Sequence, residues 1–216
     1  MDIFGPLWEN HPEKIEKNWC AVVSEEDTVL LPGDISWAMR EEEAKADLDF
    51  LAALPGKKVL LRGNHDYWWS SVSRLRRRYA DLQFLQNDAL LVEDVILCGC
   101  RGWLLPGEQT TKEDEKIYHR EVERLRLSLS FAKALGKGQL IAMLHFPPLL
   151  VEQTNTAMMD VLQQAGVQTV VFGHVHGEAN FAQVVEGTWQ GMQLHLVSAD
   201  YLRFAPKRIW TKERMD

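Results

Sequence analysis

Four short segments of the sequence end in side chains that bind metal ions in proteins. Each is an apolar run leading into glycine or proline, with the polar residues at its end: VLLPGD with Asp34, LLRGNHD with Asn64, His65 and Asp66, AMLHFPP with His145, and VFGHVHG with His174 and His176. Glycine beside a ligand lets the backbone turn sharply and an ion approach closely. A single histidine at a strand end is most often structural. Each motif taken singly is a weak signal, and only the four motifs together can decide between metal ligands and structural residues.

The elements that must position these side chains alternate between strands and helices. Short aliphatic runs predict strands over residues 29–31, 57–61, 95–100, 139–144, 169–172 and 192–198. Apolar residues at helical spacing predict helices over about 12–23, 44–54, 68–80, 110–135 and 156–165, with Thr110 and Glu113 as a capping box. The alternation predicts an α/β fold with a largely parallel sheet and a strand-rich C-terminal end. Chemistry in such sheets gathers at the carboxyl ends of the strands, so the candidate ligands should meet there.

Composition narrows the class of protein without naming its activity. The 216 residues are 46% hydrophobic and 25% charged, as in an ordinary globular chain, and predict a single domain over residues 1–216. The 24 basic and 31 acidic residues give a net charge of −7, which disfavours non-specific binding to nucleic acid. No apolar run approaches the roughly 18 residues of a membrane span. The first residues do not resemble a signal peptide.

The cysteines and several tryptophans each allow two interpretations. Three cysteines without a C-x-x-C motif favour a reducing compartment, and we expect a cytoplasmic protein. Cys98 and Cys100 share one face of a predicted strand, either as small buried residues or as a metal-binding or redox pair. Trp68, Trp69 and Trp103 are either core residues or a wall on which substrate stacks.

The order G-D, G-N-H-D, H and G-H-x-H resembles the calcineurin-like metallophosphoesterase superfamily, from about Asn10 to His195. The longer segments VLLPGDISWAM, LLRGNHDYWWSS and CGCRGW look like a bacterial subgroup of predicted phosphohydrolases. The resemblance implies a metallophosphoesterase-type β-sandwich flanked by helices. It also implies an enzyme that hydrolyses phosphate monoesters or diesters of small phosphorylated substrates.

Carried over residue by residue, the resemblance implies a set of metal ligands. Asp34 would bridge two divalent cations, and a carboxylate suits that position because its charge offsets the repulsion between ions roughly 3.5 to 4 Å apart. Asn64, His145 and His174 would complete the ligands of the second cation, and His176 would bind the first. Mixed nitrogen and oxygen ligands favour Mn, Fe, Zn, Co or Ni over Mg and Ca.

The resemblance also implies how the reaction proceeds. A metal-activated hydroxide would attack phosphorus in line, while His65 protonates or stabilises the leaving oxygen. Asp66 would bond the other ring nitrogen of His65 and so fix its tautomer and orientation. Arg101 follows a predicted strand, and it is either a clamp for the phosphate or one half of a surface salt bridge.

One motif of the family is missing from the sequence. The family pattern opens with D-x-H at the end of a first strand, and nothing before Asp34 has that form, since Asp2, Glu9 and His11 lack the spacing. We therefore expect a domain that is N-terminally shortened, lacks its first strand and binds at most one metal ion tightly. An upstream segment or a segment of a partner should fill the vacant position, because each buried unsatisfied backbone group costs about 1 to 3 kcal/mol.

Three functions stay open at this point. The first is a metal-dependent phosphoesterase. The second is a catalytically impaired module of the same fold that binds metal or phosphate. The third, a nuclease of the same superfamily, has the weakest support because no basic groove is apparent in the sequence.

Overall fold

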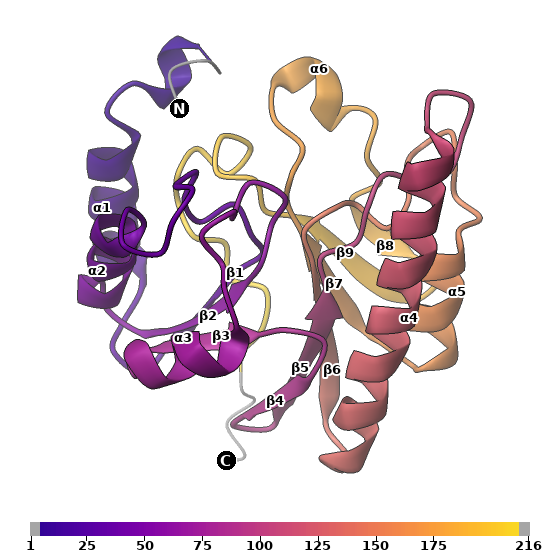
Figure 1. Cartoon of the computed structure of the whole chain (residues 1–216), viewed down its shortest axis with the longest axis horizontal. Coiled ribbons are helices and arrows are strands. Elements are labelled where there is room, and N and C mark those ends of the chain that lie inside the picture. Colours follow the sequence, from indigo (N-terminus) through magenta and orange to yellow (C-terminus); the bar gives the residue numbers. More distant parts are fainter. Residues whose placement is uncertain (1–4, 212–216) are drawn as a thin grey trace.

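Two β-sheets lie face to face between two groups of helices in the computed structural model, which describes residues 5–211 (Figure 1). The strands are β1 (Thr28–Leu31), β2 (Lys57–Leu61), β3 (Leu82–Leu85), β4 (Ala89–Val92), β5 (Val95–Cys100), β6 (Gln139–Leu144), β7 (Thr169–Phe172), β8 (Gly187–Trp189) and β9 (Met192–Leu196). The helices are α1 (His11–Val22), α2 (Lys45–Ala53), α3 (Val72–Arg78), α4 (Lys112–Ala134), α5 (Ala157–Gln164) and α6 (Glu178–Phe181), preceded by a 3-10 turn over Pro6–Trp8. The predicted α/β fold, a β-sandwich flanked by helices, is confirmed.

The strands that precede the candidate ligands are all paired in parallel. The first sheet holds β1, β2 and β3 in that order, all parallel. The second sheet has the order β4-β5-β6-β7-β9-β8, in which the four central strands are parallel and β4 and β8 pair antiparallel at the edges. The motif residues follow the carboxyl ends of β1, β2, β6 and β7, as the sequence predicts.

Apolar side chains between the sheets join them into one core. Those that meet there and are at most 2% exposed are Val59, Leu61, Leu85, Leu97, Ile141, Met143 and Val171. Helices α1, α2 and α3 cover the outer face of the first sheet with Trp19, Leu48 and Leu75. Helices α4 and α5 cover the outer face of the second sheet with Leu125 and Leu162. The four resulting layers hold the strand ends, and the turns that follow them, in a fixed arrangement.

The structure assigns the tryptophans and cysteines that the sequence leaves open. Trp68 and Trp69 are 2% and 3% exposed in the core of the first sheet, so they are core residues and form no stacking wall. Trp103 is half-buried against the core of the second sheet. Cys98 and Cys100 are buried free thiols, and burial raises the pKa of Cys98 to about 12. Both cysteines are therefore small core residues.

The long helix α4 has its capping box one residue later than predicted. The Thr111 side chain accepts from the Asp114 backbone N–H, and the Asp114 carboxylate accepts in return from the Thr111 N–H. Thr110 bonds Gly107 in the preceding turn instead. The predicted box of Thr110 and Glu113 is therefore wrong by one position. No helix among residues 5–211, α4 included, is both long enough and apolar enough to cross a membrane.

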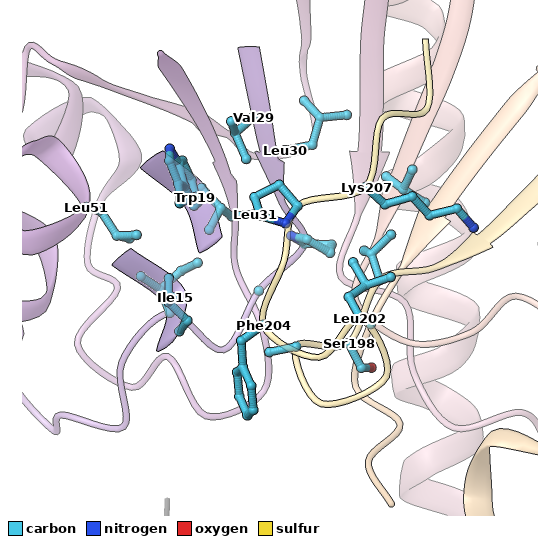
Figure 2. Close-up of a pocket in the computed structure, with 18 of the residues that line it drawn as sticks. Ile15, Trp19, Val29, Leu30, Leu31, Leu51, Ser198, Leu202, Phe204 and Lys207 are labelled. Carbon is cyan, nitrogen blue, oxygen red and sulfur yellow. The ribbon is translucent and has the colours of Figure 1, made fainter. Parts of the chain in front are cut away.

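A cavity of about 1470 Å³ lies beside β1, an edge strand of the first sheet. Strand β1 pairs with β2 alone among the described strands, and Val29, Leu30 and Leu31 line the cavity (Figure 2). Apolar residues of the second sheet, among them Leu97 and Ile141, also line it. The same cavity extends to the turns that carry the candidate ligands. It therefore joins an unpaired strand edge to the candidate site.

Candidate metal centre

Two glycines let the turns after β1 and β2 pack closely against each other. Gly33 has a φ of 103°, in the region that favours glycine, and a Cβ there would lie 2.7 Å from the Cα of Gly63. A Cβ on Gly63 would lie 2.1 Å from Oδ1 of Asp34. Side chains do not approach other atoms this closely, so a larger residue at either position would push the two turns apart. The glycines of G-D and G-N-H-D therefore set the position of the Asp34 carboxylate.

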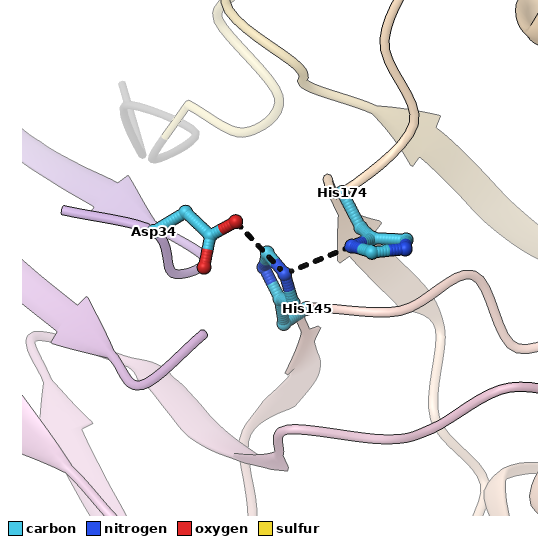
Figure 3. A group of neighbouring side chains, drawn as sticks. All are labelled: Asp34, His145 and His174. Carbon is cyan, nitrogen blue, oxygen red and sulfur yellow. Dashed lines mark hydrogen bonds and ion pairs between the residues drawn. The ribbon is translucent and has the colours of Figure 1, made fainter. Parts of the chain in front are cut away.

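Two of the candidate ligands have a left-handed backbone. Asp34 has a φ of 56° and His174 a φ of 69°. This conformation costs a non-glycine residue about 1 to 3 kcal/mol and is concentrated at functional sites. With this backbone conformation, the side chains of Asp34 and His174 lie on opposite sides of His145 (Figure 3).

Four of the five predicted ligands come together at this point. Asp34, His145 and His174 each offer a ligand atom within 4.8 Å of the other two (Figure 3). Nε2 of His145 lies 3.5 Å from Oδ2 of Asp34, 3.2 Å from Nδ1 of His174 and 2.7 Å from Oδ1 of Asn64. Asp34 and Asn64 follow strands of the first sheet, whereas His145 and His174 follow strands of the second.

The hydrogen bonding of His145 fits a cation in this group. Its Nδ1 lies 2.9 Å from the carbonyl oxygen of Pro32, which can only accept, so Nδ1 carries the proton. Burial lowers the pKa values of His145 and His174 to about 3, so both rings are neutral at pH 7. Nε2 of His145 then carries a lone pair and no proton. It faces oxygen atoms of Asn64 and Asp34, which are also hydrogen-bond acceptors. Neutral imidazoles and oxygen acceptors converging in this way fit a divalent transition ion.

Asp66 holds the turns after β1 and β2 together. Its buried carboxylate accepts five hydrogen bonds of 2.7 to 3.0 Å, from the backbone N–H groups of Asp34, Ile35, Ser36 and Gly63 and from the indole N–H of Trp68. Burial raises the pKa of the Asp66 carboxyl, and the hydrogen bonds act in the opposite direction. The predicted bond from Asp66 to the ring of His65 is wrong, because the carboxylate is fully used in joining the two turns.

The His65 ring is held by aromatic side chains instead. Trp37 stacks on it, with ring centroids 4.5 Å apart and planes inclined by 23°. The ring of Tyr67 meets it edge-on, at 6.0 Å between centroids. The backbone N–H of His65 donates to Oδ1 of Asp34 at 2.9 Å. The imidazole of His65 thus lies next to the group of ligands and, among the described residues, is not part of it.

Asp66→Asn should destabilise the metal-free protein by roughly 2 to 4 kcal/mol, because the new NH₂ group would face N–H donors and each buried unsatisfied group costs about 1 to 3 kcal/mol. Urea denaturation at pH 8 measures the loss. The matched control is Asp49→Asn, which removes only an exposed ion pair with Lys45 and should cost less than about 1 kcal/mol. Equal stability of the two variants would show that Asp66 does not hold the turns.

His176 is the predicted ligand that the structure leaves outside the group. Its Nδ1 lies 2.8 Å from Oδ1 of Asp200, and the N–H of Gly177 donates to the other carboxylate oxygen at 2.9 Å. Trp8 packs edge-on against the ring, with centroids 5.3 Å apart. A carboxylate on one ring nitrogen is the usual way to orient a metal-binding histidine. Sequence reasoning missed Asp200, whose one signal is its place just after the last predicted strand.

Arg101 forms a partly buried ion pair. Its guanidinium lies 3.3 Å from the fully buried Glu121 carboxylate and 4.4 Å above the ring of Trp103. Burial lowers the pKa of Arg101. The Arg101 carbonyl accepts from the backbone N–H of His145 at 2.9 Å, which places the residue next to the ligand turn. The ion pair is therefore not the surface salt bridge that was one interpretation of the sequence.

Comparisons with known proteins place the sequence in a family and find several partly similar proteins. The sequence model of the calcineurin-like phosphoesterase family matches residues 6–178. The Gene 66 protein of Mycobacterium phage L5 is 40% identical over 58 residues, which are 27% of this chain and 28% of the phage protein. The crystal structure of AQ665 from Aquifex aeolicus, a protein of unknown function, has a TM-score of 0.45 at 15% identity, over 92% of this chain and 81% of that one. Another solved structure has a TM-score of 0.48 at 15% identity, over 71% and 63% of the two chains.

Proposed function

The chain belongs to the calcineurin-like phosphoesterase family, and from that premise we propose that it is a metal-dependent hydrolase of phosphate monoesters or diesters. One observation carries the proposal: Asp34, His145 and His174 each offer a ligand atom within 4.8 Å of the other two, and Oδ1 of Asn64 lies 2.7 Å from Nε2 of His145. Ligand atoms grouped in this way could hold one cation among them. Two imidazoles in the set favour Mn, Fe, Zn, Co or Ni.

The side chains of the site have separate roles in the proposed reaction. The four grouped ligands hold an ion, and His176, oriented by Asp200, would bind a second ion in a complete site. When bound, a divalent ion makes water a better nucleophile at neutral pH and offsets charge on the phosphoryl group. His65 donates a proton to the leaving oxygen or stabilises it. Arg101, whose carbonyl accepts from the backbone N–H of His145, would bind a phosphoryl oxygen through its guanidinium.

We further propose that residues 1–216 are a single, N-terminally shortened domain and that a further strand fills the cavity beside β1. The residues of β1 are all partly exposed, and an unpaired strand edge offers backbone donors and acceptors to another extended segment. Glu9 and His11 do not join the ligand group: Glu9 is exposed, and Nδ1 of His11 lies 3.1 Å from the Trp8 carbonyl. Asp2 lies outside the described residues.

The 216-residue chain should therefore bind one metal ion tightly and hydrolyse phosphoesters slowly. Elemental analysis after dialysis gives the number of ions, and aryl phosphate mono- and diesters with added manganese give the activity. Adding an upstream segment that carries a strand and D-x-H should bring a second ion and raise both activity and melting temperature. Two tightly bound ions and full activity in the 216-residue chain would contradict the proposed shortening.

A second candidate function is a catalytically impaired module that binds metal or phosphate. The lack of a D-x-H motif upstream of Asp34 favours it, because without that motif only His176 and the shared Asp34 would hold the other ion. Metal binding without turnover on a panel of phosphorylated metabolites, each assayed with several divalent ions, would support the module. Cleavage of single-stranded DNA with steep salt dependence would instead indicate a nuclease.

A further inference from the structure

Two exposed aromatic side chains contact the His65 ring. Trp37 is 37% exposed and stacks on the imidazole, and Tyr67 is 51% exposed and meets its edge. Both Trp37 and His65 line the cavity that also includes Asp34. Single exposed aromatic residues are common on protein surfaces. Trp37 and Tyr67 differ from such single residues because both flank the His65 ring, beside the group of candidate metal ligands. We call these two side chains the aromatic patch.

The segment Tyr67–Trp69 contains three consecutive aromatic residues, of which two are buried and one is exposed. Trp68 and Trp69 follow Tyr67 directly and are almost fully buried, whereas Tyr67 stays outside. The Trp68 indole N–H is taken up by Asp66, and that of Trp69 by Gln86. Core packing therefore accounts for Trp68 and Trp69. It does not account for Tyr67, which is 51% exposed.

The proposed role of His65 decides what the aromatic patch would contact. A group that protonates the leaving oxygen lies against the leaving side of the substrate, away from the incoming water, because the displacement is in line. The group attached to the leaving oxygen must then lie next to Trp37 and Tyr67, the rings that flank His65. Those rings offer flat apolar faces, which suit another planar ring.

We propose that Trp37 and Tyr67 bind a planar aromatic leaving group, either an aryl ring or the base of a nucleotide, and that Trp37 also positions His65. This inference rests on the proposed hydrolase function for the direction of the substrate. The residues involved are new to the site, since the sequence pointed to Trp68, Trp69 and Trp103 as possible stacking residues. Stacking on an aromatic side chain strengthens binding by about 5- to 150-fold.

Binding is tested apart from turnover with phosphonates in which a methylene group replaces the leaving oxygen. Calorimetry in the presence of Mn²⁺ compares benzylphosphonate, pentylphosphonate and the methylene phosphonate analogue of adenosine monophosphate. We expect wild-type protein to bind the two aromatic ligands more tightly than pentylphosphonate. Trp37→Ala should weaken the binding of the two aromatic ligands about 5- to 150-fold and leave the affinity for pentylphosphonate unchanged. Trp37→Phe should retain most of the preference for aromatic ligands.

Matched variants keep the test decisive if Trp37→Ala alters the fold. Tyr67→Ala, at the other side of His65, should lower the same preference independently. Phe131→Ala, an exposed aromatic residue near the C-terminal end of α4, should change nothing. Equal wild-type affinity for benzyl- and pentylphosphonate, or equal weakening of both by Trp37→Ala, would overturn the proposal. Tighter binding of the adenosine analogue than of benzylphosphonate would identify the nucleotide as the source of the ring.

The positioning role of Trp37 has its own measurement. If Trp37 orients His65, Trp37→Ala should lower kcat most for phosphoesters with poor leaving groups, and Trp37→Phe should restore it. A change in KM alone would confine Trp37 to binding and reject the positioning role. A preference for aromatic ligands without hydrolysis of any phosphoester would reject the proposed hydrolase function and support the aromatic site. Hydrolysis without a preference for aromatic ligands would support the hydrolase function and reject the aromatic site.

Discussion

Asp34→Asn should abolish tight metal binding, because it removes the negative charge of the ligand group. The asparagine side chain has the same size, and its oxygen still accepts from the backbone N–H of His65, which lies 2.9 Å from Oδ1 of Asp34. The turn should therefore survive while the charge is lost. Elemental analysis of the purified variant, after incubation with Mn²⁺ and dialysis, measures the effect.

The neutral ligands that remain cannot compensate for this loss. Asn64, His145 and His174 carry no charge at neutral pH, since burial lowers the pKa values of both histidines to about 3. A divalent ion would then lie in a half-buried site without a counter-charge in the group, which is costly. Asp160→Asn, on the exposed side of α5, is the control and should keep its metal. Wild-type metal content in Asp34→Asn would remove Asp34 from the set of ligands.

His65→Ala should lower turnover by roughly 10²- to 10⁴-fold, the usual contribution of a positioned acid, while metal content stays near that of wild type. The ring of His65 lies outside the ligand group. Its backbone N–H, which bonds Asp34, is present in alanine as well. Activity toward aryl phosphates with good leaving groups should fall least, because those groups leave with little protonation.

Parallel measurements of metal content and rate separate the two possible roles of His65. His119→Ala, on the exposed face of α4, should leave both quantities unchanged and serves as the control. Loss of metal together with activity would make His65 a ligand. An equal loss of rate for good and poor leaving groups would remove its role in protonation.

Strands built on a short apolar run were predictable from sequence. The bounds of β2, β5, β6 and β7 agree with the predicted ranges, and each of these strands contains such a run. The short strands β3, β4 and β8 were not predicted. The helix predicted over residues 68–80 begins only at Val72, because Trp68 donates to Asp66 and Trp69 packs on the sheet as part of the turn.

The residues of the site that stand in local sequence motifs were also predictable, whereas contacts between distant positions were not. Asp34, Asn64, His145 and His174 stand in short motifs at strand ends, so their approach could be inferred from the order of the strands. The partners of Asp66 could not, because three of its five donors belong to backbone about 30 positions earlier in the chain. Asp200 reaches His176 across 24 positions without any pattern that joins them.

Each sheet is made from one continuous stretch of the chain, with β1 to β3 before residue 86 and β4 to β9 after residue 88. The two halves can therefore form one after the other during synthesis. They then contact each other through the apolar layer between the sheets and through bonds such as those of His145 Nδ1 with the Pro32 carbonyl and of the Asn18 amide with the Arg203 carbonyl. The ligand group draws two side chains from each half, so an ion bound there would join the two halves. By linkage, every tenfold excess of free metal over its dissociation constant adds about 1.4 kcal/mol to the stability of the docked state. An ion that equips the proposed site for chemistry would thus also hold the halves of the protein together.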